Sequence, residues 1–134
     1  MSYASTTEGG QTFAFPNVCK TPSPTGTIPI PYPSIGSVSD ADTDTCSEDV
    51  TIANKECCTV ESEIGSTNGD ESGSSGGVVS GQNGDLCVWE NGSSKVNIEG
   101  DAAVRFLDPV ASNGDSANAY GAQISPSQTT VVIN

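Results

Sequence analysis

The chain has 134 residues, with four basic and seventeen acidic side chains and no histidine, so its formal net charge is −13. A surface this acidic repels phosphate, and neither a nucleic acid nor an anionic membrane is expected as a binding partner. Without histidine the chain can build neither a Ser-His-Asp triad nor a Cys-His pair, and no enzymatic activity is expected.

Short apolar clusters alternate with turn residues along the whole chain, as in "VTI", "LCVW", "KVNI" and "AAVRFL". This rhythm is typical of short strands joined by tight turns, and it predicts an all-β domain with little or no helix. We expect a short N-terminal segment at 1–12, one folded domain at 13–113 and a C-terminal tail at 114–134. The N-terminus has no basic segment followed by an apolar one, so no cleaved secretion signal is expected and the chain should fold in the cytoplasm.

The first notable segment is the proline-rich stretch 19–37, "CKTPSPTGTIPIPYPSIGS". Proline fixes φ and has no backbone donor, so prolines at every second position exclude a helix and a central strand and predict an extended edge segment. The residues between those prolines point to one side and form an apolar face, Ile28, Ile30 and Tyr32. This face is expected either to pack against the rest of the domain or to bind a partner.

Two later segments resemble each other at a spacing of about 46 residues. "EDVTIANKECC" from Glu48 and "SKVNIEGDAAV" from Ser94 both begin with a Val-x-Ile strand pattern, and each is followed by an Asn-Gly-Asp. Each copy predicts a β-hairpin, with its turn at Asn54-Lys55 or at Gly100-Asp101. A single hairpin is marginally stable in water, so the two copies are expected to share a core.

The segment between the copies contains turn signals at Gly76-Gly77, Asn83-Gly84 and Asn91-Gly92. They flank "VVS" (78–80) and "LCVWE" (86–90), which we expect to be strands of further hairpins. In the tail, residues 131–133 are expected either to add an edge strand or to fray.

The five cysteines are an odd number, and a disulfide framework is not expected in the cytoplasm. Most would be small buried thiols. The alternative is a metal site built from thiolates alone, because tetrahedral zinc or iron sites need no histidine. The candidate ligands are Cys19, Cys46, Cys57, Cys58 and Cys87.

Three motifs occur in the order "VCKTPSPTGTIPIPYPSIGSVSD" (18–40), "GDESGSSGGVVSG" (69–81) and "KVNIEGDAAVRFLD" (95–108). Together they resemble the PAAR-like proteins that form the spike tips of contractile injection systems. The third motif has Asp101-Ala-Ala-Val-Arg105 where the family has a Pro-Ala-Ala-Arg segment. The resemblance covers about residues 13–113.

The resemblance implies a small cone-shaped stack of β-hairpins that caps a trimeric β-helical (VgrG-like) spike, one tip per trimer, and sharpens it for puncture of the target membrane. The spike would belong to a type VI secretion system, an extracellular injection system or a phage tail. It would carry the tip out of the cell, effectors would be the further partners, and contact with the target membrane would be mechanical. On this view Ile28, Ile30 and Tyr32 are the expected spike-binding residues.

The chain departs from the family at the metal site that PAAR proteins carry near the point, which is held by histidines and a cysteine. Here Ser112-Asn113 stands where relatives have His-Asn, so the usual site cannot form. Either a zinc or iron ion is bound by cysteines or the tip has no metal. Arg105 is expected to form a structural ion pair with Asp108 or Asp70. The alternative function is a small acidic β-rich surface or secreted binding module.

Overall fold

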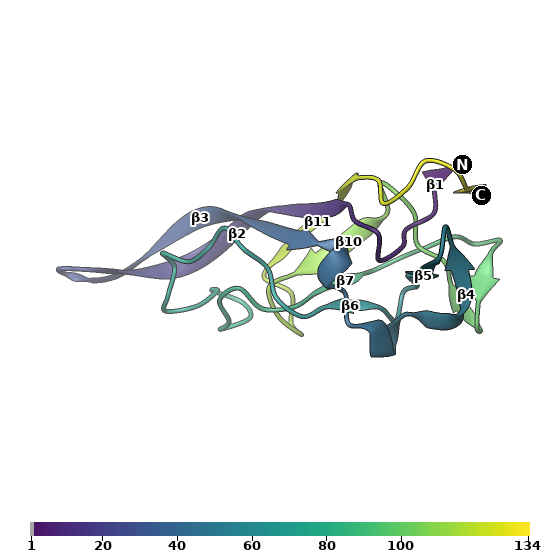
Figure 1. The fold of residues 1–134 in the computed structure, drawn as a ribbon. Coiled ribbons are helices and arrows are strands. Elements are labelled where there is room, and N and C mark those ends of the chain that lie inside the picture. The colour runs from purple at the N-terminus through teal and green to yellow at the C-terminus, as the bar shows by residue number, and fades with distance from the viewer. Residues whose placement is uncertain (1) are drawn as a thin grey trace.

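Six antiparallel strands form the main sheet of the protein, in the order β3-β2-β11-β10-β7-β6. The computed structural model describes residues 2–134. Figure 1 shows the sheet running along the long axis of the molecule. Its strands are β2 (Gln11–Ser23), β3 (Gly26–Ser37), β6 (Glu63–Ile64), β7 (Cys87–Trp89), β10 (Pro109–Ser112) and β11 (Ala119–Ser125).

Three two-stranded sheets complete the fold, and the only helical elements among residues 2–134 are two short 3₁₀ turns, η1 (Val38–Asp40) and η2 (Thr43–Thr45). The predicted all-β fold with little helix is therefore confirmed. The small sheets pair β1 (Ser2–Tyr3) with β12 (Val132–Ile133), β4 (Ser47–Ile52) with β5 (Lys55–Cys57), and β8 (Asn97–Ile98) with β9 (Asp101–Ala102).

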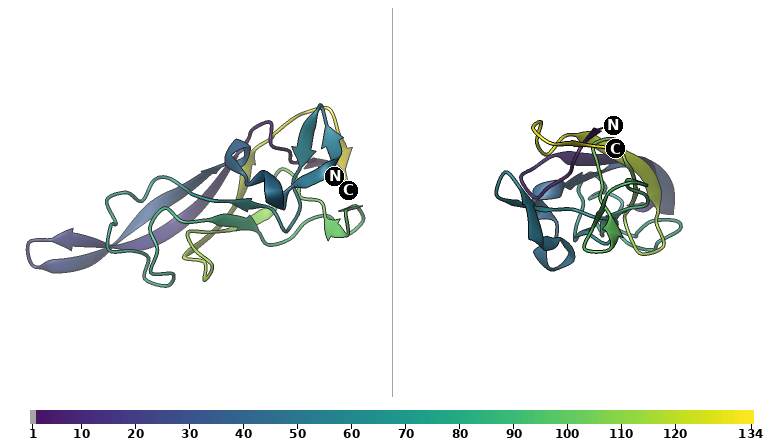
Figure 2. Two further views of the ribbon diagram at one scale, coloured as in Figure 1. Left: turned by 60° about the horizontal axis from the view of Figure 1, so that its bottom comes forward. Right: turned by 90° about the vertical axis from the view of Figure 1, so that its right-hand side faces the viewer.

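The molecule tapers from a broad end to a narrow one. The small hairpins and both termini lie at the broad end, and the β2–β3 hairpin projects alone at the narrow end (Figures 1 and 2). This shape agrees with the predicted cone. No helix among residues 2–134 has the length and hydropathy that crossing a membrane requires.

The part of the proline-rich segment with prolines at every second position lies in β3, which is an edge strand as predicted, whereas residues 19–23 belong to β2. The backbone N–H of Ile35 points away from β2 and donates to the carbonyl of Asn68 (2.8 Å). The backbone nitrogens of Pro29, Pro31 and Pro33 also point away from β2, because these residues lie an even number of positions before Ile35. Prolines have no N–H to leave unpaired, so this outer edge tolerates them.

A register shift in β2 between Ala14 and Asn17 places Phe15 and Pro16 both in solvent. Because this bulge adds one residue, the side chains that face inward are Thr12 and Ala14 before the bulge and Asn17 and Cys19 after it. All four of these inward side chains are buried.

The two predicted hairpins exist, but each turn lies one residue earlier than expected. The turn residues are Ala53-Asn54 and Glu99-Gly100, because Ile52 pairs with Lys55 and Ile98 with Asp101. All four turn residues have positive φ, between 53° and 91°, as a type I′ turn requires. The hairpins share a small core as predicted, made of Cys57, Ile98 and Ala103 with Ile52, Val96 and Ile133 packed against it.

The "VVS" segment does not form a strand, contrary to the prediction. Val78 and Val79 lie in a turn and are 51% and 66% exposed. "LCVWE" contains the expected strand β7, but this strand does not form a hairpin. It pairs with β6 and β10, and no short turn joins it to either of them.

The C-terminal residues contribute more structure than the sequence indicated. The expected edge strand is present as β12, which pairs with β1. Residues 119–125, expected to be irregular tail, form β11, which lies between β2 and β10. The chain after 114 therefore completes the sheet. The main core lies beneath this sheet and consists of Val38, Ala41, Cys46, Cys58, Ile64, Cys87, Trp89, Val104 and Val110.

Candidate functional site

The two faces of β2 and β11 differ in an unusual way, because small and polar residues face inward and aromatic residues face solvent. In β2, Thr12 and Ala14 are buried, whereas Phe13 and Phe15 are 37% and 54% exposed. Residue Ala122 of β11 pairs with Phe13, so Tyr120 and Ile124 point to the same side as Phe13 by alternation. We call Phe13, Phe15, Tyr120 and Ile124 the outer face.

None of the outer-face side chains carries a charge, although the chain has a net charge of −13. Tyr120 is 59% and Ile124 is 51% exposed. Contiguous apolar surface on a soluble protein marks an interaction site more often than chance exposure does. The outer face is therefore the best candidate for a docking surface, and the sequence analysis missed it.

The predicted spike-binding residues lie on the other side of the β2–β3 hairpin. Ile28 is 48% exposed near the narrow end, but Ile30 and Tyr32 are half-buried. The Tyr32 hydroxyl shares a hydrogen bond of 2.8 Å with Thr21, and its ring lies close to Gly73. The protein's own loop thus covers part of the face that the sequence suggested, and only Ile28 is freely available.

A buried polar network lies beneath the hairpin and holds this loop in place. Asp70 is fully buried, and its Oδ2 accepts hydrogen bonds from Asn17 Nδ2 (2.8 Å) and from the backbone N–H of Gly84 (3.0 Å). Asn113 Nδ2 donates to Asn17 Oδ1 and to the carbonyl of Gln82, both at 3.0 Å. The network joins four distant parts of the chain. Asp70 Oδ1 is buried without a partner among the described residues.

Cys19 lies in this network, where burial and then the neighbouring Asp70 carboxylate raise the pKa of the Cys19 thiol to about 11. A thiol with this pKa is protonated at neutral pH, whereas metal ligation needs the thiolate. Cys19 therefore suits packing better than metal binding.

The other four cysteines are also buried, but they do not converge on one point. Cys87 lies against the Thr12 hydroxyl (3.5 Å), and Cys57 belongs to the core shared by the small hairpins. Cys46 and Cys58 form a pair with 3.9 Å between their sulfurs. Among residues 2–134 no group of three or more His, Cys, Asp and Glu side chains is arranged to hold a metal ion. The residues present do not fit a cysteine-bound zinc or iron ion in this arrangement.

The predicted ion pair between Arg105 and Asp108 is present. Arg105 Nε donates to Asp108 Oδ2 (3.0 Å) and Nη2 donates to Oδ1 (2.8 Å), and the backbone N–H of Arg105 also donates to Oδ2 (2.7 Å). The bond to Asp108 raises the pKa of the Arg105 guanidinium. The pair closes the turn at residues 105–108. This turn also holds the N-terminal segment, because Ala4 forms a β-bridge with Arg105 and the N–H of Phe106 donates to the carbonyl of Tyr3.

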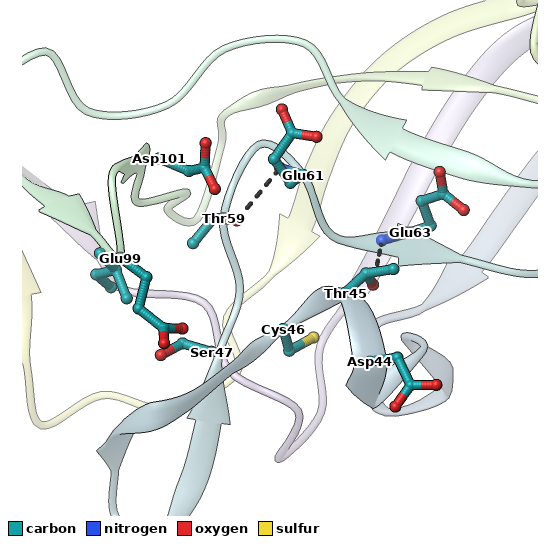
Figure 3. Close-up of a pocket in the computed structure, with 10 residues that line it drawn as sticks. Asp44, Thr45, Cys46, Ser47, Thr59, Glu61, Glu63, Glu99 and Asp101 are labelled. Carbon is teal, nitrogen blue, oxygen red and sulfur yellow. Dashed lines mark hydrogen bonds between the residues drawn. The ribbon is translucent and has the colours of Figure 1, made fainter.

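A solvent-open pocket of about 530 Å³ lies at the broad end (Figure 3). Its charged lining residues are all acidic, and no lysine or arginine lines it. The pocket also contains the Cys46 side chain. The acidic lining residues are Asp44, Glu61, Glu63, Glu99 and Asp101.

The fold and these surfaces define a small, tapered, all-β protein with a long hairpin and a broad apolar sheet face. The family model of the toxin PAAR-like domain matches residues 10–121, and the chain belongs to this family. The match ends inside β11 and includes its first three residues, 119–121. Searches of curated proteins and of solved structures found no match.

Proposed function

We propose that the protein is the tip of a contractile injection spike, which caps a trimeric β-helical spike protein and sharpens it for membrane puncture. The observation that carries this proposal is the outer face, where four uncharged side chains, three of them aromatic, are exposed side by side on two paired strands of a highly acidic chain. The tapered shape and the membership in the PAAR-like family support it (Figure 2).

The proposed spike contact lies on the outer face. The end of a β-helix exposes its apolar interior and its unpaired strand edges, and both need a cover. Phe13, Phe15 and Tyr120 offer rigid rings that lose little conformational entropy on docking. An apolar contact also avoids the desolvation cost that the many carboxylates of this chain would bring to an interface.

The role is mechanical and needs no chemical step. The hairpin at the narrow end is tied to the body by the Asp70 network, so a force on the hairpin meets a connected structure rather than a loose loop. We propose that the chain stays in the cytoplasm until it is assembled on the spike, and leaves the cell with it. Effectors would bind separately.

The test is co-purification of the tagged full chain with the trimeric spike protein from the same organism, with the mass of the complex measured by light scattering. The proposal expects one tip per three spike chains, and loss of the complex in the double variant Phe15→Ser/Tyr120→Ser. The Ile28→Ser variant tests the surface expected from the sequence. Loss of binding in Ile28→Ser alone would move the contact to the hairpin and overturn the outer-face assignment.

A small acidic surface or secreted binding module is the second candidate, and the acidic pocket is the observation that favours it. If a well-folded protein binds no spike, baseplate or sheath protein at micromolar concentrations, the tip proposal fails and the binding module replaces it.

A further inference from the structure

Cys46 and Cys58 are placed to form a disulfide, although both are free thiols in this structure. Their sulfurs are 3.9 Å apart. Ser47 pairs with Cys57 across the β4–β5 hairpin, so Cys46 and Cys58 face each other one position further out. Their backbone N–H groups donate elsewhere, to Thr43 and Ser5, so the two cysteines do not exchange backbone hydrogen bonds.

Cys46 and Cys58 directly follow the last ladder pair, Ser47 and Cys57. An antiparallel pair at such a position that exchanges no backbone hydrogen bonds has Cα atoms about 4.5 Å apart. That separation falls within the range of about 4.4–6.8 Å seen in disulfides. The two sulfurs can therefore bond through small side-chain rotations, without a change in the backbone pairing.

Only one of the two thiols can be reached from solvent. Both cysteines belong to the main core, but Cys46 also lines the acidic pocket (Figure 3) and is 8% exposed, whereas Cys58 does not line it and is 1% exposed. The S–H of Cys58 is the main cause that lowers the pKa of Cys46 to about 7, and the hydroxyls of Ser62 and Thr45 act in the same direction. An oxidant from solvent thus reaches Cys46 first, and Cys58 is the thiol that can then react with the oxidised Cys46.

The charge of the pocket selects among oxidants. Carboxylates from Asp44, Glu61 and Glu63 line it together with Glu99 and Asp101, and no cation balances them within the lining. They repel anionic oxidants such as oxidised glutathione and leave access open to small neutral ones. Hydrogen peroxide has the required size and charge.

We propose that Cys46 and Cys58 form a peroxide-sensitive thiol pair, in which Cys46 is oxidised first and Cys58 then closes a disulfide. The Cys46 thiolate attacks one peroxide oxygen and the O–O bond breaks. The released hydroxide takes a proton and leaves as water, and Cys46 becomes a sulfenic acid. Cys58 sulfur then attacks Cys46 sulfur, the S–O bond breaks, and hydroxide leaves as water with the Cys58 proton. Two thiols lose two electrons, and one peroxide becomes two waters.

The disulfide would link the start of β4 to the end of β5, close to the shared core of the small hairpins. A crosslink that restricts the unfolded chain raises stability, so we expect the melting temperature to rise by about 5 °C on oxidation. The inference does not depend on the spike-tip proposal, since it concerns the thiol pair alone.

The test treats the reduced full chain with one equivalent of hydrogen peroxide and maps the disulfides by mass spectrometry without reduction. We expect a single major link, between the peptides containing Cys46 and Cys58. In the Cys58→Ser variant, Cys46 should be trapped as a sulfenic acid that dimedone labels. Cys19→Ser is the matched control, because Cys19 is buried in a separate network and its loss should leave the link unchanged.

Oxidant choice is the second readout, and it uses the wild-type chain. Peroxide and the cationic disulfide cystamine should oxidise Cys46 at least ~10-fold faster than oxidised glutathione at equal concentration in low salt, because of the acidic pocket. A main link between other cysteines, or equal rates with glutathione and cystamine, would overturn the proposal.

Discussion

Asn17 and Asp70 are joined by a hydrogen bond of 2.8 Å between Asn17 Nδ2 and Asp70 Oδ2, although 53 residues separate them in the chain. Both side chains are fully buried. The bond ties the middle of β2 to the loop that follows β6, and it adds a buried side-chain contact to the backbone bonds that attach the projecting hairpin to this loop.

Removing the Asp70 carboxylate should destabilise the protein strongly. In Asp70→Ala, the N–H donors of Asn17 and Gly84 lose their buried acceptor, and each unpaired buried group costs about 1–3 kcal/mol. We expect the free energy of unfolding in urea to fall by about 3 kcal/mol. Asp115→Ala is the control, because Asp115 ends the second Asn-Gly-Asp and is exposed. Equal effects of the two substitutions would show that the network does not anchor the hairpin.

Gly121→Ala tests whether β11 is part of the folded body. A Cβ at Gly121 would overlap the Phe13 carbonyl oxygen and the backbone of Ala14, so β2 and β11 would have to separate. A backbone displacement of this kind costs about 3 kcal/mol or more. Gly65→Ala is the matched control, since nothing lies within 4 Å of the added Cβ. If Gly121→Ala melts at the wild-type temperature, β11 does not pair as described.

The turn at Ala53-Asn54 offers a stabilising change. Ala53 has φ 53°, a left-handed conformation that costs a residue with a Cβ about 1–2 kcal/mol and that asparagine tolerates better. Ala53→Asn should raise the free energy of unfolding by about 0.5–1 kcal/mol. Ala102→Asn, in strand β9, should give no gain. A decrease in stability for Ala53→Asn would contradict the type I′ turn.

The reactivity of Cys46 should depend on pH. The hydrogen bond from Cys58 is the largest influence and lowers the pKa of Cys46 from 9.0 to about 7, against the opposing effects of burial and Glu56. Because the thiolate is the reactive form, alkylation by a neutral iodoacetamide should be half-maximal near pH 7 and decline below it. Peptide mass spectrometry can follow each cysteine separately. Cys19, with a pKa raised to about 11, should react only in strong alkali. A half-maximum near pH 9 for Cys46 would contradict the pairing with Cys58.

The sequence predicted the local elements well. The edge strand β3 follows from its prolines, and the two small hairpins follow from Val-x-Ile patterns beside turn residues. The predicted turns lie one residue late, because Asn54 and Gly100 are each the second turn residue, and a non-glycine residue, Ala53 or Glu99, takes the left-handed position before it.

The elements that depend on distant partners were missed. β11 contains Ala119 and Gln123 on its inward side, and these are buried because β2 and β10 flank the strand. Asn17 and Asn113 could not be distinguished from surface asparagines by any local pattern. The outer face did leave a signal, since the alternation "TFAF" places Phe13 and Phe15 on one side. The sequence does not say that the aromatic side is the exposed one.

The most direct test of the proposed function is the mass of the complex between the full chain and its trimeric spike protein, measured for the wild type and for Phe15→Ser/Tyr120→Ser. Val79→Ser is the control, because Val79 is 66% exposed but lies in a turn and not in the main sheet. We predict one tip per three spike chains for the wild type and the control. For the double variant we predict no complex at the same concentration, with an unchanged melting temperature. A folded double variant that binds the spike like the wild type would contradict the assignment of the outer face, and a wild-type chain that binds no spike would contradict the function itself.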